Sequence, residues 1–151
     1  MLFRSYRGFH HLPRLFIYLG EHDSKVCAIL DTGSECNLIP WTMVESRGIA
    51  WSPTTTVSVG LHGKESFMGE CVVPVWLGPH VVSQHFFILD DSKRNYSVIL
   101  GMPFVQNTKM TFDYLESGGI RAKLVMDDNK LLIASCFVPE LSRRKKTANP
   151  Q

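Results

Sequence analysis

The sequence predicts a single all-β domain, and three observations support this prediction. The chain has 151 residues, which is an ordinary length for one domain. Hydrophobic residues make up 44% of it and aromatic residues 11%, which is enough apolar surface for a buried core. The apolar residues occur in short runs rich in β-branched and aromatic side chains, and Gly, Asp, Asn or Pro interrupt these runs. This pattern is typical of β-strands joined by short turns.

Nine segments fit the strand pattern. We expect strands at residues 15–19, 25–30, 55–61, 67–77, 81–89, 97–100, 110–114, 120–126 and 130–138. Residues with turn chemistry, such as His62-Gly63 and Gly78-Pro79, separate several of them. Residues 41–47 fit a helix, because Pro40 suits a helix start and Gly48 suits the residue after its end. A second short helical segment is expected from Pro103.

We expect the folded domain to span residues 14–138, with residues 1–13 as a leader or linker. The apolar pattern stops after Pro139 and the basic run Arg143-Arg144-Lys145-Lys146 follows, so residues 139–151 are interpreted as a basic, disordered tail. Such a run can also be a localisation signal or a nucleic-acid contact. Residues 130–138 form an unusually apolar strand, which could pair with a second chain or only complete its own sheet.

Charge and composition argue against several partners. Sixteen Lys and Arg against 14 Asp and Glu give a net charge of +2, too small to indicate a nucleic-acid partner. No apolar run approaches the roughly 20 residues of a membrane span, so we expect no membrane partner. The four cysteines and six histidines show no metal-ligand spacing, so we expect no metal and no cofactor. Reduced thiols and the lack of a signal-peptide pattern favour a cytoplasmic location.

The segment with the clearest chemical content is an apolar strand that runs directly into Asp31-Thr32-Gly33-Ser34. A carboxylate at the end of a buried strand loses hydration and must be compensated, a combination common at functional sites. Gly33 allows close approach of the backbone to a ligand, and Thr32 and Ser34 supply short hydroxyls. The alternative is a polar turn that closes a hairpin, since Asp and Gly are ordinary turn residues.

Together with the following run Asn37-Leu38-Ile39-Pro40, this segment resembles the active-site turn of retropepsin-like aspartic proteases, particularly those of long-terminal-repeat retrotransposons. Ile99-Leu100-Gly101 resembles that family's second signature, in which an apolar pair supports the catalytic turn and a short helix follows. The resemblance implies a retropepsin-like acid protease fold, namely a closed β-barrel with a flap hairpin and one or two short helices, assembled as a two-fold homodimer. Gly60, Leu61, His62 and Gly63 lie where the family places its flap, although an ordinary exposed hairpin would look similar.

The family's chemistry uses two carboxylates that share one proton and activate one water. This chain has a single Asp-Thr-Gly, so the resemblance implies that a second Asp31 comes from a second chain. It further implies that the Thr32 hydroxyl binds the partner's backbone, that Gly33 lets the substrate pass, and that Ser34 hydrogen-bonds the outer oxygen of Asp31. Two departures weaken the transfer: Met102 stands where retroviral enzymes carry Arg, and Glu35-Cys36 differ from the retroviral residues after the glycine.

These features favour an aspartic endopeptidase that cuts a peptide or polyprotein substrate, such as a retrotransposon-type polyprotein. The alternative is a catalytically silent module that keeps the fold for dimerisation or peptide binding. A phosphorylation site of the P-type, built on Asp-Lys-Thr-Gly, is excluded because the Lys is absent.

Overall fold

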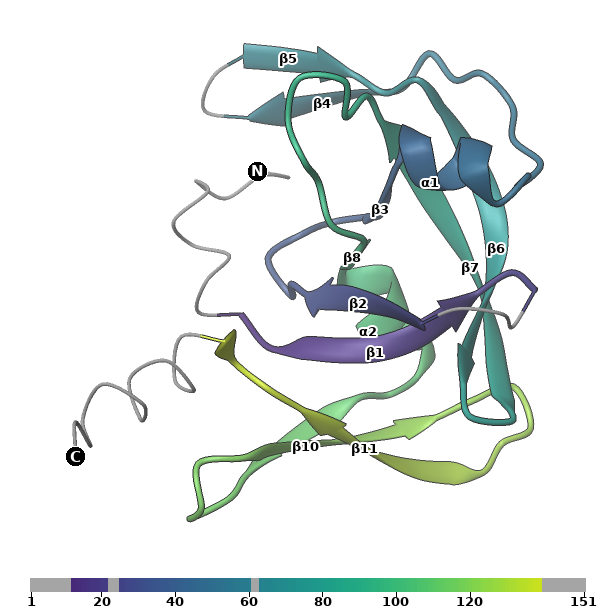
Figure 1. Cartoon of the computed structure of the whole chain (residues 1–151). Coiled ribbons are helices and arrows are strands. Elements are labelled where there is room, and N and C mark those ends of the chain that lie inside the picture. Colours follow the sequence, from purple (N-terminus) through teal and green to yellow (C-terminus); the bar gives the residue numbers. More distant parts are fainter. Residues whose placement is uncertain (1–11, 22–24, 61–62, 140–151) are drawn as a thin grey trace.

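The structure is a computed structural model and describes residues 12–21, 25–60 and 63–139 (Figure 1). The all-β prediction is confirmed: the described residues form eleven strands and two six-residue helices. Most of the expected leader (1–13), nearly all of the basic tail (139–151), and Leu61 and His62 of the expected flap lie outside the described residues. In chain order the elements are β1 (Arg14–Leu19), β2 (Lys25–Leu30), β3 (Asn37–Pro40), α1 (Trp41–Ser46), β4 (Val57–Gly60), β5 (Gly63–Ser66), β6 (Gly69–Leu77), β7 (His80–Leu89), β8 (Ile99–Leu100), α2 (Met102–Asn107), β9 (Thr111–Tyr114), β10 (Ile120–Val125) and β11 (Leu131–Cys136).

Six strands close into a barrel in the order β1-β2-β8-β3-β7-β6. Two neighbouring pairs, β1–β2 and β6–β7, are consecutive in sequence and antiparallel, and the long β6–β7 hairpin turns at Gly78, where φ is +57°. The other neighbours are distant in sequence: β3 pairs with β7 in parallel, β1 pairs with β6, and β8 lies between β2 and β3, parallel to the first and antiparallel to the second. Strand β8, from late in the chain, is thus inserted beside β2, which ends immediately before Asp31.

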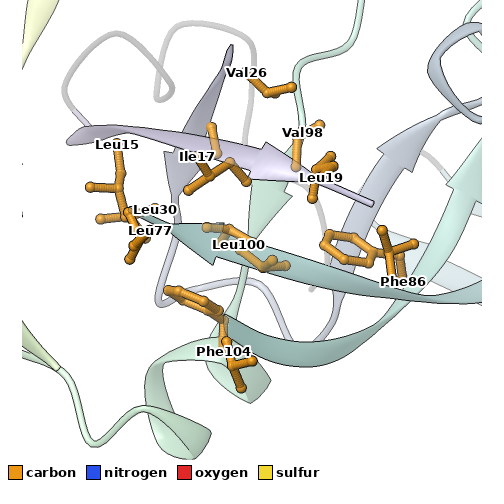
Figure 2. Close-up of a cluster of buried hydrophobic side chains, with 14 of the residues drawn as sticks. Leu15, Ile17, Leu19, Val26, Leu30, Leu77, Phe86, Val98, Leu100 and Phe104 are labelled. Atoms are coloured by element: carbon orange, nitrogen blue, oxygen red, sulfur yellow. The ribbon is translucent and has the colours of Figure 1, made fainter. Parts of the chain in front are cut away.

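The barrel interior is filled by side chains that alternate along the strands. In β1, Leu15, Ile17 and Leu19 are buried, whereas Phe16 between them is exposed. Figure 2 shows the side chain of Leu100 between those of Ile17 and Phe104, so β8 and α2 both contribute to this core. Burying side chains of this size contributes about 1.5–3 kcal/mol each. A second buried cluster, made of Ile29, Cys36, Leu38, Phe67, Leu89 and Ile99, lies apart from the first.

Two strands were not expected from the sequence. Strand β3 is short and buried at all four positions, so it lacks the alternation that marks a half-buried strand. Strand β5 has the sequence Gly-Lys-Glu-Ser, with no β-branched or aromatic residue, and it forms by pairing with β4. Tertiary pairing therefore overrides local preference in both cases.

The two helices lie close to the expected positions. Helix α1 ends one residue earlier than expected, with Arg47 as its C-cap and Gly48 at a φ of +61°. Its first turn is bound by Asp91, whose carboxylate accepts the Thr42 N–H at 3.1 Å and the Thr42 hydroxyl at 2.5 Å. Helix α2 begins at Met102, one residue before Pro103. No helix in the described ranges is long and apolar enough to cross a membrane.

The last three strands form a separate sheet in the order β9-β10-β11. It is connected to the barrel by a bridge between Arg14 and Phe137, which exchange backbone hydrogen bonds of 2.7 and 3.2 Å. Leu131 and Ile133 on β11 are 67% and 54% exposed, so one face of this strand is apolar and open.

Candidate active site

Asp31 directly follows β2 and is fully buried. Its backbone N–H donates to the Leu100 carbonyl at 3.0 Å, and its own carbonyl accepts the Ser34 N–H at 3.0 Å. The Gly33 N–H donates to the carboxylate Oδ1 at 2.9 Å. A backbone N–H that donates to one carboxylate oxygen fixes the direction in which the side chain points. The tight turn therefore holds both the backbone and the carboxylate of Asp31 in place.

The residues that follow Asp31 in the turn differ in solvent exposure. Thr32, Gly33 and Glu35 are exposed, whereas Ser34 is buried. The Ser34 hydroxyl donates to the Cys36 carbonyl at 2.7 Å, not to the outer oxygen of Asp31 as expected. A hydroxyl has one proton to donate, so the role of Ser34 in this structure is to brace the backbone of the turn.

Residues Ile99, Leu100 and Gly101 lie directly against this turn, although they are distant in sequence. Ile99 pairs with Ile29 and with Leu38, and Leu100 pairs with Leu30. The Met102 N–H donates to the Ser34 carbonyl at 2.8 Å. A Cβ atom on Gly101 would lie 2.4 Å from the Cys36 carbonyl oxygen and 2.7 Å from that of Ser34, so only glycine fits there.

Sequence reasoning assigned no role to Asn37, which is fully buried beside the turn. Its Oδ1 accepts the Gly101 N–H at 2.9 Å, and its Nδ2 donates to Gln84 Oε1 at 3.0 Å and to the His85 carbonyl at 2.9 Å. A signal was available: a polar side chain that opens an apolar run must find partners if the run is buried. The partners themselves, on β7, could not be identified without the fold.

Of the expected flap residues, Gly60 ends β4 and Gly63 begins β5. The β4–β5 hairpin pairs from Val57 with Ser66 to Gly60 with Gly63, and it forms a two-stranded sheet separate from the barrel. In Figure 1 β4 and β5 lie at the top, and the connection between β2 and β3 lies below them. The role of this hairpin as a flap stays a prediction.

The cysteine nearest the turn is not poised as a nucleophile. Burial raises the pKa of the Cys36 thiol to about 11, and the nearby Glu35 charge acts in the same direction. It therefore stays protonated at neutral pH, and Cys-based catalysis at this turn is disfavoured. Within residues 12–21, 25–60 and 63–139, no three His, Cys, Asp or Glu side chains gather so as to hold a metal ion.

Similar structures share this architecture. The retroviral protease-like domain of Ddi1 from Leishmania major superposes with a TM-score of 0.52 at 17% identity, covering 81% of this chain and 95% of that domain. The EIAV protease, complexed with an inhibitor, superposes with a TM-score of 0.50 at 16% identity, covering 64% of this chain and 86% of that protein. At these identities the likeness is one of fold, and it identifies the barrel with its hairpin as a retropepsin-like fold.

A comparison with curated proteins finds no match to this chain. Residues 19–104, which are more than half of the sequence, match the aspartyl protease family. That range begins at the end of β1 and includes the Asp31 turn, the β4–β5 hairpin, β8 and the start of α2. The family match of the sequence and the fold of the similar structures indicate the same family, and the chain belongs to the aspartyl protease family of retropepsin-like proteins.

Proposed function

We propose that this chain is an aspartic endopeptidase that acts as a homodimer, with Asp31 of each subunit in a shared active site. The observation that carries the proposal is the fixed carboxylate of Asp31, held at the end of β2 by the Gly33 N–H at 2.9 Å and by the Asp31–Leu100 backbone bond. A carboxylate fixed beside an exposed Thr and Gly suits a site that is completed from outside the subunit.

The chemistry requires a second carboxylate. Two acids close together cannot both be ionised, so one keeps a proton while the other is a base. The sequence contains one Asp-Thr-Gly, so the second acid would be Asp31 of the partner subunit. Thr32 and Gly33, exposed on the same turn, would face that partner and the substrate.

In the proposed reaction the ionised carboxylate takes a proton from a water molecule, whose oxygen forms a bond to the peptide carbonyl carbon. The protonated carboxyl donates its proton to the carbonyl oxygen in the same step. The carboxyl that received the water proton then donates it to the peptide nitrogen, and a hydroxyl of the tetrahedral intermediate returns its proton to the other carboxylate as the C–N bond breaks. An acid and an amine are released, the pair again holds one proton, and no covalent enzyme intermediate forms. The substrate class is an extended peptide within a polyprotein, covered by the β4–β5 hairpin.

The proposed dimer has a candidate surface on β11. This strand pairs with β10 along its length, and among the described residues its other edge meets β1 only at the Arg14–Phe137 bridge. Leu131 and Ile133 are exposed on it. A partly open edge with apolar side chains is a natural site for pairing with a second copy.

The test is cleavage of a peptide library at acidic pH by the purified chain, with and without a statine-type inhibitor. Asp31→Asn should abolish cleavage, whereas Asp113→Asn, the same charge change at a half-exposed residue of β9 that pairs with Lys123, should leave it intact. Mixing equal amounts of wild type and Asp31→Asn should leave about one quarter of the wild-type activity per dimer after subunit exchange, because random pairing gives that share of intact sites. Half of the activity would refute a shared site, and peptide binding without turnover would favour the silent module.

A further inference from the structure

We infer that Asn37 is a positioning residue that sets the orientation of Asp31 through the Leu100–Gly101 peptide group. The inference rests on the proposed function, since it concerns the carboxylate proposed to be catalytic. Asn37 touches neither substrate nor reacting atoms in this scheme, and its effect is transmitted by one backbone group.

A single peptide plane connects the two residues. The carbonyl of Leu100 accepts the Asp31 N–H at 3.0 Å, and the N–H of Gly101 donates to Asn37 Oδ1 at 2.9 Å. These two groups belong to the same peptide unit, and no described peptide bond is cis. In a trans peptide the C=O and the N–H point in opposite directions. The plane is therefore held at one edge by the backbone of Asp31 and at the other by the side chain of Asn37.

The far side of Asn37 is anchored to the barrel wall. Its two amide protons are directed to Gln84 Oε1 and to the His85 carbonyl, both on β7. Gln84 is 2% exposed and donates in turn to the Ser83 carbonyl at 3.0 Å. The orientation of the Asn37 amide is fixed chemically, because the Gly101 N–H needs an acceptor and the two β7 oxygens need donors.

The requirement at this position is therefore one acceptor and two donors on a short side chain. An amide meets it without placing a charge in the interior, whereas an apolar residue would remove the acceptor of the Gly101 N–H and the side-chain donor to the His85 carbonyl. Hydrogen bonds at both ends of a peptide also polarise it, which strengthens the bond from Asp31. Catalytic groups tolerate little displacement: a shift of about 1 Å can cost about 100-fold in rate.

Three variants separate positioning from stability. Asn37→Leu keeps the number of side-chain heavy atoms and the branch at Cγ, and it removes all three hydrogen bonds. Asn37→Asp, when protonated in acid, restores an acceptor for Gly101 and a donor for the His85 carbonyl. Thr108→Val is the matched control, because Thr108 is equally buried and its hydroxyl donates to the Phe104 carbonyl at 2.7 Å, at the far end of α2.

Two readouts are measured: the kinetics of peptide cleavage and the hydrogen exchange of the Asp31 amide. Asn37→Leu should lower kcat by about 10- to 100-fold with little change in KM, since the loss is one of orientation. At acidic pH, Asn37→Asp should recover most of that kcat. The Asp31 amide should exchange about tenfold faster in Asn37→Leu than in Thr108→Val, relative to the global unfolding rate of each variant.

The outcomes distinguish this inference from the proposed function. If neither the wild type nor any variant cleaves peptides, the proposed function fails. The hydrogen exchange of the Asp31 amide then still tests whether Asn37 holds Asp31 in place through the Leu100–Gly101 peptide group. Wild-type kcat and wild-type exchange in Asn37→Leu would overturn the inference. Equal losses in Asn37→Leu and Thr108→Val would also overturn it, because they would show that Asn37 contributes only stability.

Discussion

Gly101→Ala tests how closely β8 is packed against the turn that carries Asp31. The φ at Gly101 is −94°, which alanine adopts freely, so the effect of the change is steric. The new Cβ would lie 2.4 Å from the Cys36 carbonyl oxygen, 2.7 Å from that of Ser34 and 3.0 Å from the Cys36 carbonyl carbon. All three atoms are backbone, and they cannot move without displacing the turn.

Overpacking of this kind costs about 1–3 kcal/mol or more, and three backbone contacts place this variant at about 3 kcal/mol. A domain of this size loses about 2–4 °C in Tm for each kcal/mol, so we expect Tm to fall by about 6–12 °C. The assay is thermal unfolding followed by circular dichroism. Gly119→Ala is the control, since its Cβ would meet only Leu115 at 3.4 Å and Ser117 at 3.8 Å. A Tm for Gly101→Ala within about 2 °C of the control would refute the packing argument.

Other parts of the fold give four further predictions. Burial raises the pKa of the three buried thiols to about 11, so at pH 8 a thiol reagent should modify only exposed Cys27 until the protein is unfolded. Because these thiols bind their protons more tightly in the folded state, the free energy of unfolding should also fall as the pH rises above about 9. Asp91→Ala should destabilise the protein by about 1 kcal/mol, measured by urea unfolding, because the Thr42 N–H at the start of α1 loses its acceptor. Leu131→Lys with Ile133→Lys should shift sedimentation from dimer to monomer and leave the β-sheet spectrum unchanged, and a dimer that persists would exclude β11 from the interface.

Much of the fold could be predicted because its signals are local. Strand β7 is rich in β-branched and aromatic residues, β2 is an apolar run after Lys25, and α1 has Pro40 before it and Gly48 after it. The predictions missed elements whose signals lie elsewhere in the chain. Strand β5 forms because β4 pairs with it, and the α1 terminus is bound by Asp91, 49 residues beyond Thr42.

The candidate site shows the same division. Asp31 and its turn were predicted from adjacent residues, and Gly101 from a second short motif. The contacts of Ser34 and Asn37 could not be predicted in the same way. Two acceptors lie near Ser34 in sequence, the Asp31 carboxylate and the Cys36 carbonyl. The geometry of the turn decides which of them accepts the Ser34 hydroxyl. The Asn37 amide donates to Gln84 and His85 on β7, a strand that is distant in sequence and lies beside Asn37 only in the folded chain.

The physical basis of the Ile-Leu-Gly motif follows from the place of β8 between two cores. Successive side chains of a strand point to opposite faces. Leu100 therefore enters the main core with Phe104, whereas Ile99 enters the second cluster with Phe67. Because both faces are buried, the strand needs two consecutive apolar residues instead of the usual alternation. Two residues are enough for a strand here because β2 and β3 pair with it on both edges, and glycine must follow because the Asp31 turn leaves no space for a side chain.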